Sequence, residues 1–230
     1  MKNWESKSQL KLKINHRCKA ATGVESGDPM KKIGIIGGTF DPVHYGHLIL
    51  AEQARVEASL DQVVFMPAMV QPFKLNARIA GGNHRYAMLL EAVTGNPYFS
   101  VSRRELDSSE ISYTINTLRD CKAELGDEAE LFFIIGTDAF LGLEKWYASK
   151  ELLEGFSFIV GTRPGYKERE LKLLIGRLKE EYGTEIIEIN NSEVEISSTG
   201  IKDRIQGGKS IKYLLPESVE EYIYKNRLYV

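Results

Sequence analysis

The chain has 230 residues, of which 43% are hydrophobic and 27% are charged, as is ordinary for a globular protein with a sizeable core. Its formal net charge of −2 gives no electrostatic reason to expect a nucleic-acid partner, and no run approaches the ~20 apolar residues that span a bilayer. The two cysteines, Cys18 and Cys121, provide neither a disulfide framework nor metal-ligand spacing. We therefore expect a cytoplasmic protein without nucleic-acid or membrane partners.

Residues 1–29 differ in composition from the rest of the chain. Basic side chains are scattered among polar ones up to residue 19, and Gly, Ser and Asp are frequent from residue 22 to residue 29. The segment has no apolar core of the kind that signal peptides carry, and Met30 directly after it is itself a candidate initiator. We interpret residues 1–29 as a flexible N-terminal extension and residues 31–230 as one domain.

The first predicted strand leads into a glycine turn. Residues 33–36 are a short apolar, β-branched run of the kind found in buried parallel strands. Gly37 and Gly38 are expected to break this strand, and their missing Cβ atoms let the backbone approach a ligand closely. A helix is predicted from Gly46 onward, because an alanine-rich segment with one apolar side follows.

Two histidines stand at the start of this predicted helix. His44 and His47 lie at or just before its N-terminus, where free N–H groups and the positive end of the helix dipole attract anions. The turn lacks both the Rossmann G-x-G-x-x-G spacing and the Lys-Ser/Thr pair of a P-loop. The pattern therefore indicates phosphate chemistry at a site of another kind.

Strands and helices alternate along the rest of the chain. This alternation predicts an α/β fold, a Rossmann-like and mostly parallel sheet with helices on both faces and ligands beyond the carboxyl ends of the strands. Further strands are predicted at residues 62–66, 99–102, 131–135, 156–160 and 185–189, and further helices at residues 83–94, 112–125, 167–182, 196–206 and 217–226.

The strand at residues 131–135 ends in G-T-D, residues 136–138. From there Asp138 can accept a hydrogen bond from a sugar hydroxyl, although an Asp that caps a helix is about equally consistent with the local sequence. Trp146 and Tyr147 follow on the same side of the sheet, and an indole face can stack on a pyridine ring, although most Trp side chains simply pack.

The segment I-S-S-T-G-I-K at residues 196–202 is a second candidate phosphate site. Hydroxyls at a helix start either cap the helix or donate to an anion, and Lys202 lies one turn further, within reach of a phosphate. Taken alone, the segment is more simply explained as a helix cap. The hydroxyl residues of this segment are Ser197, Ser198 and Thr199.

Several motifs together resemble the bacterial nicotinate-nucleotide adenylyltransferases of the H-x-G-H nucleotidyltransferase superfamily. They are G-G-T-F-D-P-V-H-Y-G-H at residues 37–47, S-Y-T-I at 112–115, G-T-D at 136–138, W-Y at 146–147 and Y-L-L-P-x-x-V-x-x-Y-I at 213–223. The resemblance covers residues 31–230 and departs from the family at two positions. Phe73 replaces the histidine of the family's P-x-H-K, and Lys202 stands where an arginine is usual.

This resemblance implies a fold, a reaction and a set of site residues. The fold is of the nucleotidyltransferase type, and the reaction transfers AMP from ATP to nicotinate mononucleotide by direct in-line attack, giving deamido-NAD and pyrophosphate for NAD synthesis. His44 and His47 would be catalytic at the ATP phosphates. ATP would also meet Gly37, Gly38, Thr39, Phe40, Gly136, Asp138, Ser197, Ser198, Thr199 and Lys202, and nicotinate mononucleotide would meet Lys74, Tyr113, Thr114, Trp146 and Tyr147.

The resemblance also implies that Mg²⁺ arrives with ATP, because no carboxylate cluster marks a dedicated metal site. It leaves a homo-oligomer open, as well as the choice between nicotinate and nicotinamide mononucleotide. Two alternatives stand beside it. One is another enzyme of the superfamily, such as pantetheine-phosphate adenylyltransferase or a cytidylyltransferase, and the other is a non-catalytic nucleotide-binding regulator.

Overall fold

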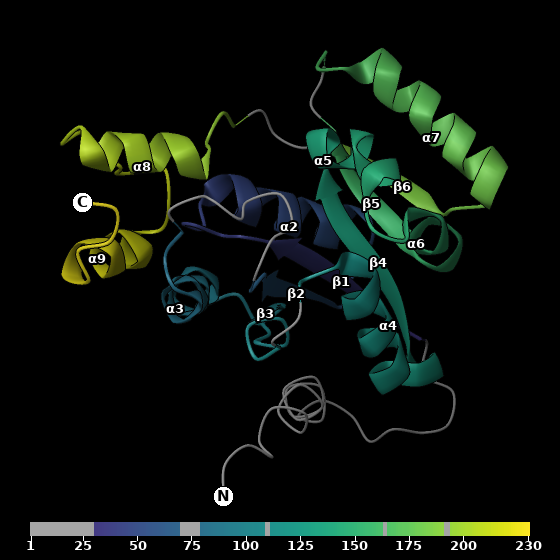
Figure 1. The fold of residues 1–230 in the computed structure, drawn as a ribbon, viewed down its shortest axis with the longest axis horizontal. Coiled ribbons are helices and arrows are strands. Elements are labelled where there is room, and N and C mark those ends of the chain that lie inside the picture. The colour runs from purple at the N-terminus through teal and green to yellow at the C-terminus, as the bar shows by residue number, and fades with distance from the viewer. Residues whose placement is uncertain (1–29, 70–78, 109–110, 163–164, 191–193) are drawn as a thin grey trace, which may run out of the picture.

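The computed structural model describes residues 30–69, 79–108, 111–162, 165–190 and 194–230. The extension predicted at residues 1–29 lies outside the described residues, as do Phe73 and Lys74. The described chain forms one six-stranded parallel sheet in the order β3-β2-β1-β4-β5-β6, which confirms the predicted α/β class (Figure 1). The strands are β1 (Lys31–Gly38), β2 (Gln62–Pro67), β3 (Phe99–Val101), β4 (Ala129–Gly136), β5 (Ser157–Thr162) and β6 (Ile186–Asn190).

Helices cover both faces of the sheet. The helices are α2 (Tyr45–Glu57), α3 (Gly82–Val93), α4 (Thr114–Leu125), α5 (Thr137–Leu141), α6 (Ser149–Gly155), α7 (Glu168–Tyr182), α8 (Ser198–Gln206) and α9 (Glu217–Lys225). In Figure 1, α3, α8 and α9 lie to the left of the sheet, and α4, α6 and α7 lie to its right. Among the described residues no helix is both long and apolar enough to cross a bilayer.

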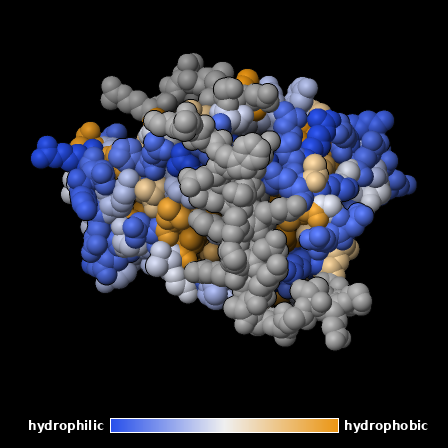
Figure 2. Space-filling model, turned by 90° about the horizontal axis from the view of Figure 1, so that it is seen from below, coloured by the Kyte–Doolittle hydropathy of each residue, from blue (hydrophilic) through white to orange (hydrophobic). Residues whose placement is uncertain are grey.

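Alternation along the central strands divides the core in two. In β4, Phe132 and Ile134 face the side covered by α2, α3, α8 and α9, whereas Phe133 and Ile135 face the side covered by α4 to α7. A strand buried on both faces reads as a continuous apolar run, which explains why β4 is so hydrophobic. On the outside, apolar side chains gather near the middle of the face in Figure 2, between hydrophilic flanks.

The glycine turn differs from its prediction. Gly37 and Gly38 do not break the strand but form its last two positions, opposite Met66 and Pro67 of β2. Backbone pairing to β2 continues because parallel pairing uses only main-chain groups, and glycine supplies these as well as any residue. The two short helices α5 and α6 were not predicted, since they are too short to show a helical repeat in the sequence.

Candidate active site

The start of α2 brings the two signature histidines together. His44 is the N-cap residue, and its backbone N–H donates to Nδ1 of His47 over 3.3 Å, so the His47 side chain caps the start of the helix. The ring centroids lie 3.7 Å apart. Because Nδ1 of His47 accepts, a neutral His47 ring carries its proton on Nε2, which is then the nitrogen able to donate to an anion.

The two histidines differ in burial. His44 is only 6% exposed, and burial lowers the pKa of its imidazole to about 4, so this ring is neutral at physiological pH. Within the described structure its Nδ1 has no hydrogen-bond partner. His47 is half-buried and packs edge-on against Phe40, with 5.0 Å between the ring centroids. Phe40 therefore supports His47 through its ring, which is itself buried.

The start of α8 packs against the same loop. Ser197 caps this helix by accepting from the backbone N–H of Gly200 over 3.1 Å. The hydroxyl of Ser198 donates to the carbonyl oxygen of Pro42 over 2.9 Å, and the ammonium of Lys202 lies 2.9 Å from Oδ2 of Asp41. The N-termini of α2 and α8 thus both lie against the loop between β1 and α2. This arrangement brings the ammonium of Lys202 close to the free N–H groups of two helix starts.

A cavity of about 320 Å³ lies on the α4 side of the sheet, near the carboxyl ends of β1 and β2, and it meets the loop that leads to the histidines at Gly37 and Gly38. Its volume is in the range of small-molecule sites. Its lining combines the glycines at the end of β1 with the S-Y-T and W-Y segments. The lining residues of these segments are Gly37, Gly38, Ser112, Tyr113, Thr114, Trp146 and Tyr147.

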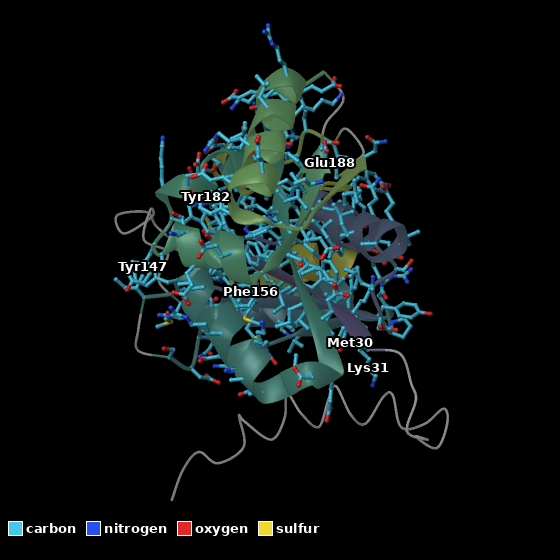
Figure 3. All side chains as sticks on the ribbon, turned by 90° about the vertical axis from the view of Figure 1, so that its right-hand side faces the viewer. Met30, Lys31, Tyr147, Phe156, Tyr182 and Glu188 are labelled. Atoms are coloured by element: carbon cyan, nitrogen blue, oxygen red, sulfur yellow. The ribbon has the colours of Figure 1, made fainter. Side chains whose placement is uncertain are left out.

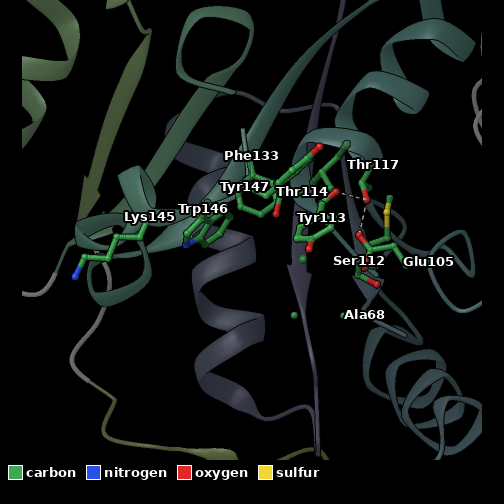
Figure 4. Close-up of a pocket in the computed structure, with 14 residues that line it drawn as sticks. Ala68, Glu105, Ser112, Tyr113, Thr114, Thr117, Phe133, Lys145, Trp146 and Tyr147 are labelled. Carbon is green, nitrogen blue, oxygen red and sulfur yellow. Dashed lines mark hydrogen bonds between the residues drawn. The ribbon is translucent and has the colours of Figure 1, made fainter. Parts of the chain in front are cut away.

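Aromatic rings form one wall of the cavity (Figure 4). Tyr113 and Tyr147 stack on each other, with 4.4 Å between their centroids, and Trp146 packs edge-on against Phe133. Tyr147 is 59% exposed and lies at the edge of the molecule in Figure 3. Lys145 also lines the cavity, but its ammonium points away from the other labelled side chains in Figure 4.

A half-buried carboxylate, that of Glu105, connects residues on the other side of the cavity. Glu105 accepts a 2.6 Å hydrogen bond from the hydroxyl of Thr117 and another from the hydroxyl of Ser112. Ser112 in turn accepts from the backbone N–H of Met69 over 3.0 Å. Burial raises the pKa of Glu105, while the two hydroxyl hydrogen bonds lower it. The network ties the ends of β2 and β3 to the start of α4.

The structure does not gather all the predicted residues into one site. Asp138 lies on α5 with a largely exposed side chain, and its Oδ1 accepts from the hydroxyl of Tyr166 over 2.9 Å and from the ammonium of Lys167 over 3.0 Å. Thr39 is buried, and its carbonyl accepts from the guanidinium of Arg85 over 2.8 Å. Gly136 ends β4, and Thr199 lies exposed in the first turn of α8.

Sequence reasoning overlooked Asp41, Glu105, Thr117 and Tyr229, all of which the structure connects to the site. Asp41 sits inside the G-G-T-F-D-P signature, so that motif was a signal for it. The other three carry no local signal, because each is defined by a partner from another part of the chain.

The described residues contain no group of three or more His, Cys, Asp or Glu side chains arranged to hold a metal ion. Asp41, the acidic side chain nearest the histidines in the sequence, is already paired with Lys202. These donors do not fit a metal ion held by the protein.

Comparisons with known proteins agree with this geometry. The model of the family described as cytidylyltransferase-like matches residues 35–204, which span both helix starts. A match over this much of the chain places it in this cytidylyltransferase-like class. A curated protein of Thermoanaerobacter sp. (strain X514), named "Probable nicotinate-nucleotide adenylyltransferase", is 43% identical over 198 residues, covering 86% of this chain and 94% of that protein. A protein of the same name from Moorella thermoacetica is 44% identical, covering 86% of this chain and 91% of its own.

At this identity and coverage, the chain belongs to the family of nicotinate-nucleotide adenylyltransferases. Solved structures support the fold. Nicotinic acid mononucleotide adenylyltransferase of Plasmodium falciparum, complexed with NaAD, matches with a TM-score of 0.70 at 21% identity, covering 86% of this chain and 97% of that one. The same enzyme complexed with APC gives a TM-score of 0.69 at 20% identity.

Proposed function

We propose that this chain transfers the AMP moiety of ATP to nicotinate mononucleotide, giving deamido-NAD and pyrophosphate. One observation carries the proposal: the α2 and α8 starts, with His44, His47 and Lys202, pack on the loop that follows Gly37 and Gly38, and these two glycines line an aromatic-walled cavity. The first feature suits a polyphosphate and the second suits a flat ring. A bisubstrate reaction between two nucleotides needs both features side by side.

The chemistry that we propose is a direct displacement. An oxygen of the mononucleotide 5′-phosphate attacks the α-phosphorus of ATP, and the bond from that phosphorus to the bridging oxygen breaks as pyrophosphate leaves. The attacking phosphate is already ionised, so no general base is needed. Catalysis then consists of positioning and of stabilising the charge on the α-phosphate and on the leaving group.

Each group of residues has a separate role in this proposal. His44 and His47 donate to the ATP phosphates. Lys202, Ser197, Ser198 and Thr199 hold the triphosphate tail. Gly37, Gly38, Thr39 and Phe40 present backbone to ATP, Gly136 and Asp138 meet a ribose, and Lys74, Tyr113, Thr114, Trp146 and Tyr147 receive the mononucleotide.

Asp138 can bind a ribose hydroxyl only by sharing its carboxylate with Tyr166 and Lys167, which both donate to Oδ1. A carboxylate has about four acceptor sites, so these two donors do not exhaust its acceptor capacity. We therefore keep Asp138 in the proposed site as an acceptor for the sugar, reached from the α5 side.

Mg²⁺ belongs to the proposal as an ion carried by the phosphates of ATP. The protein's contribution is the set of cationic and N–H donors described above, and no step depends on a metal held by side chains. The same proposal places the reaction in the cytoplasm with small nucleotides as the only partners, and the oligomeric state is a separate measurement.

The test measures pyrophosphate release with ATP-Mg²⁺ and, in separate reactions, nicotinate mononucleotide, nicotinamide mononucleotide and phosphopantetheine. We expect strong turnover with nicotinate mononucleotide and weak turnover with the other two. Turnover with phosphopantetheine would leave the proposed roles of the histidines in place. It would contradict the proposal that the aromatic wall binds a flat ring. ATP binding without turnover on any of the three would indicate a regulator.

A further inference from the structure

The carboxylate of Asp41 collects three donors from distant parts of the chain. Asp41 is 3% exposed, and its Oδ1 accepts from the backbone N–H of Ala80 over 3.0 Å and from the hydroxyl of Tyr229 over 2.6 Å. Its Oδ2 accepts from the ammonium of Lys202 over 2.9 Å. A buried carboxylate needs such donors, because removing a charge from water without hydrogen bonds is costly.

Tyr229 reaches this carboxylate from the segment that follows α9. It is separated from Asp41 by 188 positions in the sequence, and its ring also lies beneath the ammonium of Lys202, 5.9 Å from the ring centroid. Burial first, and then the hydrogen bond to Asp41, raise the pKa of the Tyr229 hydroxyl well above its usual value. The hydroxyl therefore keeps its proton and acts as the donor.

In the proposed reaction, Lys202 interacts with two anions, the carboxylate of Asp41 and a phosphate of ATP. An ammonium has three N–H donors, and the ion pair with Asp41 uses one of them, which leaves others for a phosphate. The Lys202 side chain is 22% exposed, so it remains accessible from solvent. The strength of the ion pair with Asp41 then decides how readily the Lys202 ammonium can reorient toward a phosphate.

We propose that Tyr229 is a positioning residue for the triphosphate of ATP: its hydroxyl orients and partly neutralises Asp41, which holds Lys202 at the start of α8. The inference rests on the proposed function in assigning Lys202 to the triphosphate tail. Without the hydroxyl, Asp41 loses a fixed orientation and its full charge acts on Lys202. Both changes weaken the contact between Lys202 and a phosphate.

The experiment compares Tyr229→Phe with wild type and with Tyr224→Phe, a matched loss of a hydroxyl on α9, where the side chain is 48% exposed. Equilibrium dissociation constants are measured for ATP-Mg²⁺ and for AMP. We expect Tyr229→Phe to weaken ATP binding by about 5- to 10-fold, the effect of losing one charge-assisted hydrogen bond, and to change AMP binding by less than about twofold. Tyr224→Phe should change neither.

AMP is the decisive ligand, because it shares the adenosine and the α-phosphate with ATP but lacks the tail that Lys202 holds. Equal losses for ATP and AMP would indicate a merely structural role and overturn the proposal, as would unchanged ATP binding. In a Lys202→Met background, Tyr229→Phe should have no further effect on ATP. If that background does not fold, the ratio of ATP to AMP affinities still decides.

These binding measurements need no turnover. Failure to use nicotinate mononucleotide would count against the proposed function and would leave the result on Tyr229 intact.

Discussion

At the scale of single residues, the two signature histidines have different surroundings although they stand three positions apart. His44 is buried and held neutral, whereas His47 is half-buried and is oriented by the N–H of His44 and by the edge of the Phe40 ring. A neutral imidazole donates through one nitrogen, so in the proposed site His44 would offer a phosphate one hydrogen bond without carrying positive charge in the free protein.

Replacing His47 tests its role as a preorganised donor. We expect His47→Ala to lower turnover by about 100-fold or more, as the loss of one such donor does in other sites, while the fold persists. The measurement is the rate of pyrophosphate release at saturating ATP and nicotinate mononucleotide, alongside the melting temperature. His84→Ala, which removes a histidine bonded to Tyr222 on the α3–α9 side, is the matched control and should retain activity. Near-normal turnover of His47→Ala would remove the catalytic assignment.

The low pKa of His44 predicts how stability depends on pH. The folded pKa of about 4 lies below the ordinary 6.5, so between these values the unfolded chain binds a proton that the folded chain does not. This contribution is fully present above pH 6.5 and is lost as the pH falls, by up to about 3 kcal/mol. Urea unfolding between pH 7 and about pH 4.5 measures it. The slope should shrink in His44→Asn, and an unchanged slope would contradict the assignment.

At the scale of elements, local sequence explains most of what forms. The helix α7 has three buried side chains at helical spacing, Leu171, Ile175 and Leu178, and its other faces are charged. Its interior also contains Gly176, and it ends at Gly183, which has a φ of 69°. Only Gly183 requires the conformational freedom of glycine, because its backbone is left-handed. Gly176 lies within the helix and has no such requirement.

Alanine substitutions at the two glycines should therefore have opposite signs. An added Cβ at Gly176 meets nothing within 4 Å and the position is exposed, so Gly176→Ala should raise the free energy of unfolding by about 0.5–1 kcal/mol. Gly183→Ala forces a Cβ into a positive φ and should lower it by about 1 kcal/mol. Chemical denaturation of both variants is the measurement, and equal signs would contradict the argument.

At the scale of the whole molecule, both halves of the candidate site depend on contacts between distant segments. Asp41 meets Tyr229, and Glu105 joins Ser112 and Thr117 on the far side of the cavity. Neither network is contained in one element. The site is therefore sensitive to the way that the loops beyond the carboxyl ends of the strands pack together.

Thr117→Val tests the second network, because it keeps the side-chain shape and removes the donor to Glu105. Thr184→Val is its control: that hydroxyl is equally buried and donates over 2.7 Å to the carbonyl of Leu153, away from the cavity. Both changes should lower the free energy of unfolding by about 1–3 kcal/mol. Only Thr117→Val should raise the KM for nicotinate mononucleotide, with the KM for ATP unchanged. Equal KM values for nicotinate mononucleotide in the two variants would show that the Glu105 network does not contribute to substrate binding.

The sequence by itself determined the order of the strands and of the helices other than α5 and α6, the two helix-start motifs and the family, because each of these depends on residues that are close in the chain. Apolar runs and helical repeats show β1, β4 and α7, and the G-G-T-F-D-P-V-H-Y-G-H stretch shows where the histidines stand. The prediction that Gly37 and Gly38 break β1 was wrong because it used local preference alone: pairing with β2, a separate segment, outweighs the low strand preference of glycine.

Only the tertiary structure decided which side chains meet. The sequence places Lys202 one turn into a helix, but it does not reveal that Asp41 and Tyr229 hold the ammonium. It likewise does not show that Glu105 supports the S-Y-T segment. The physical reason is that helix and strand formation follow from periodicity along the chain, whereas the partner of a buried charge follows from how the packed elements bring remote loops together.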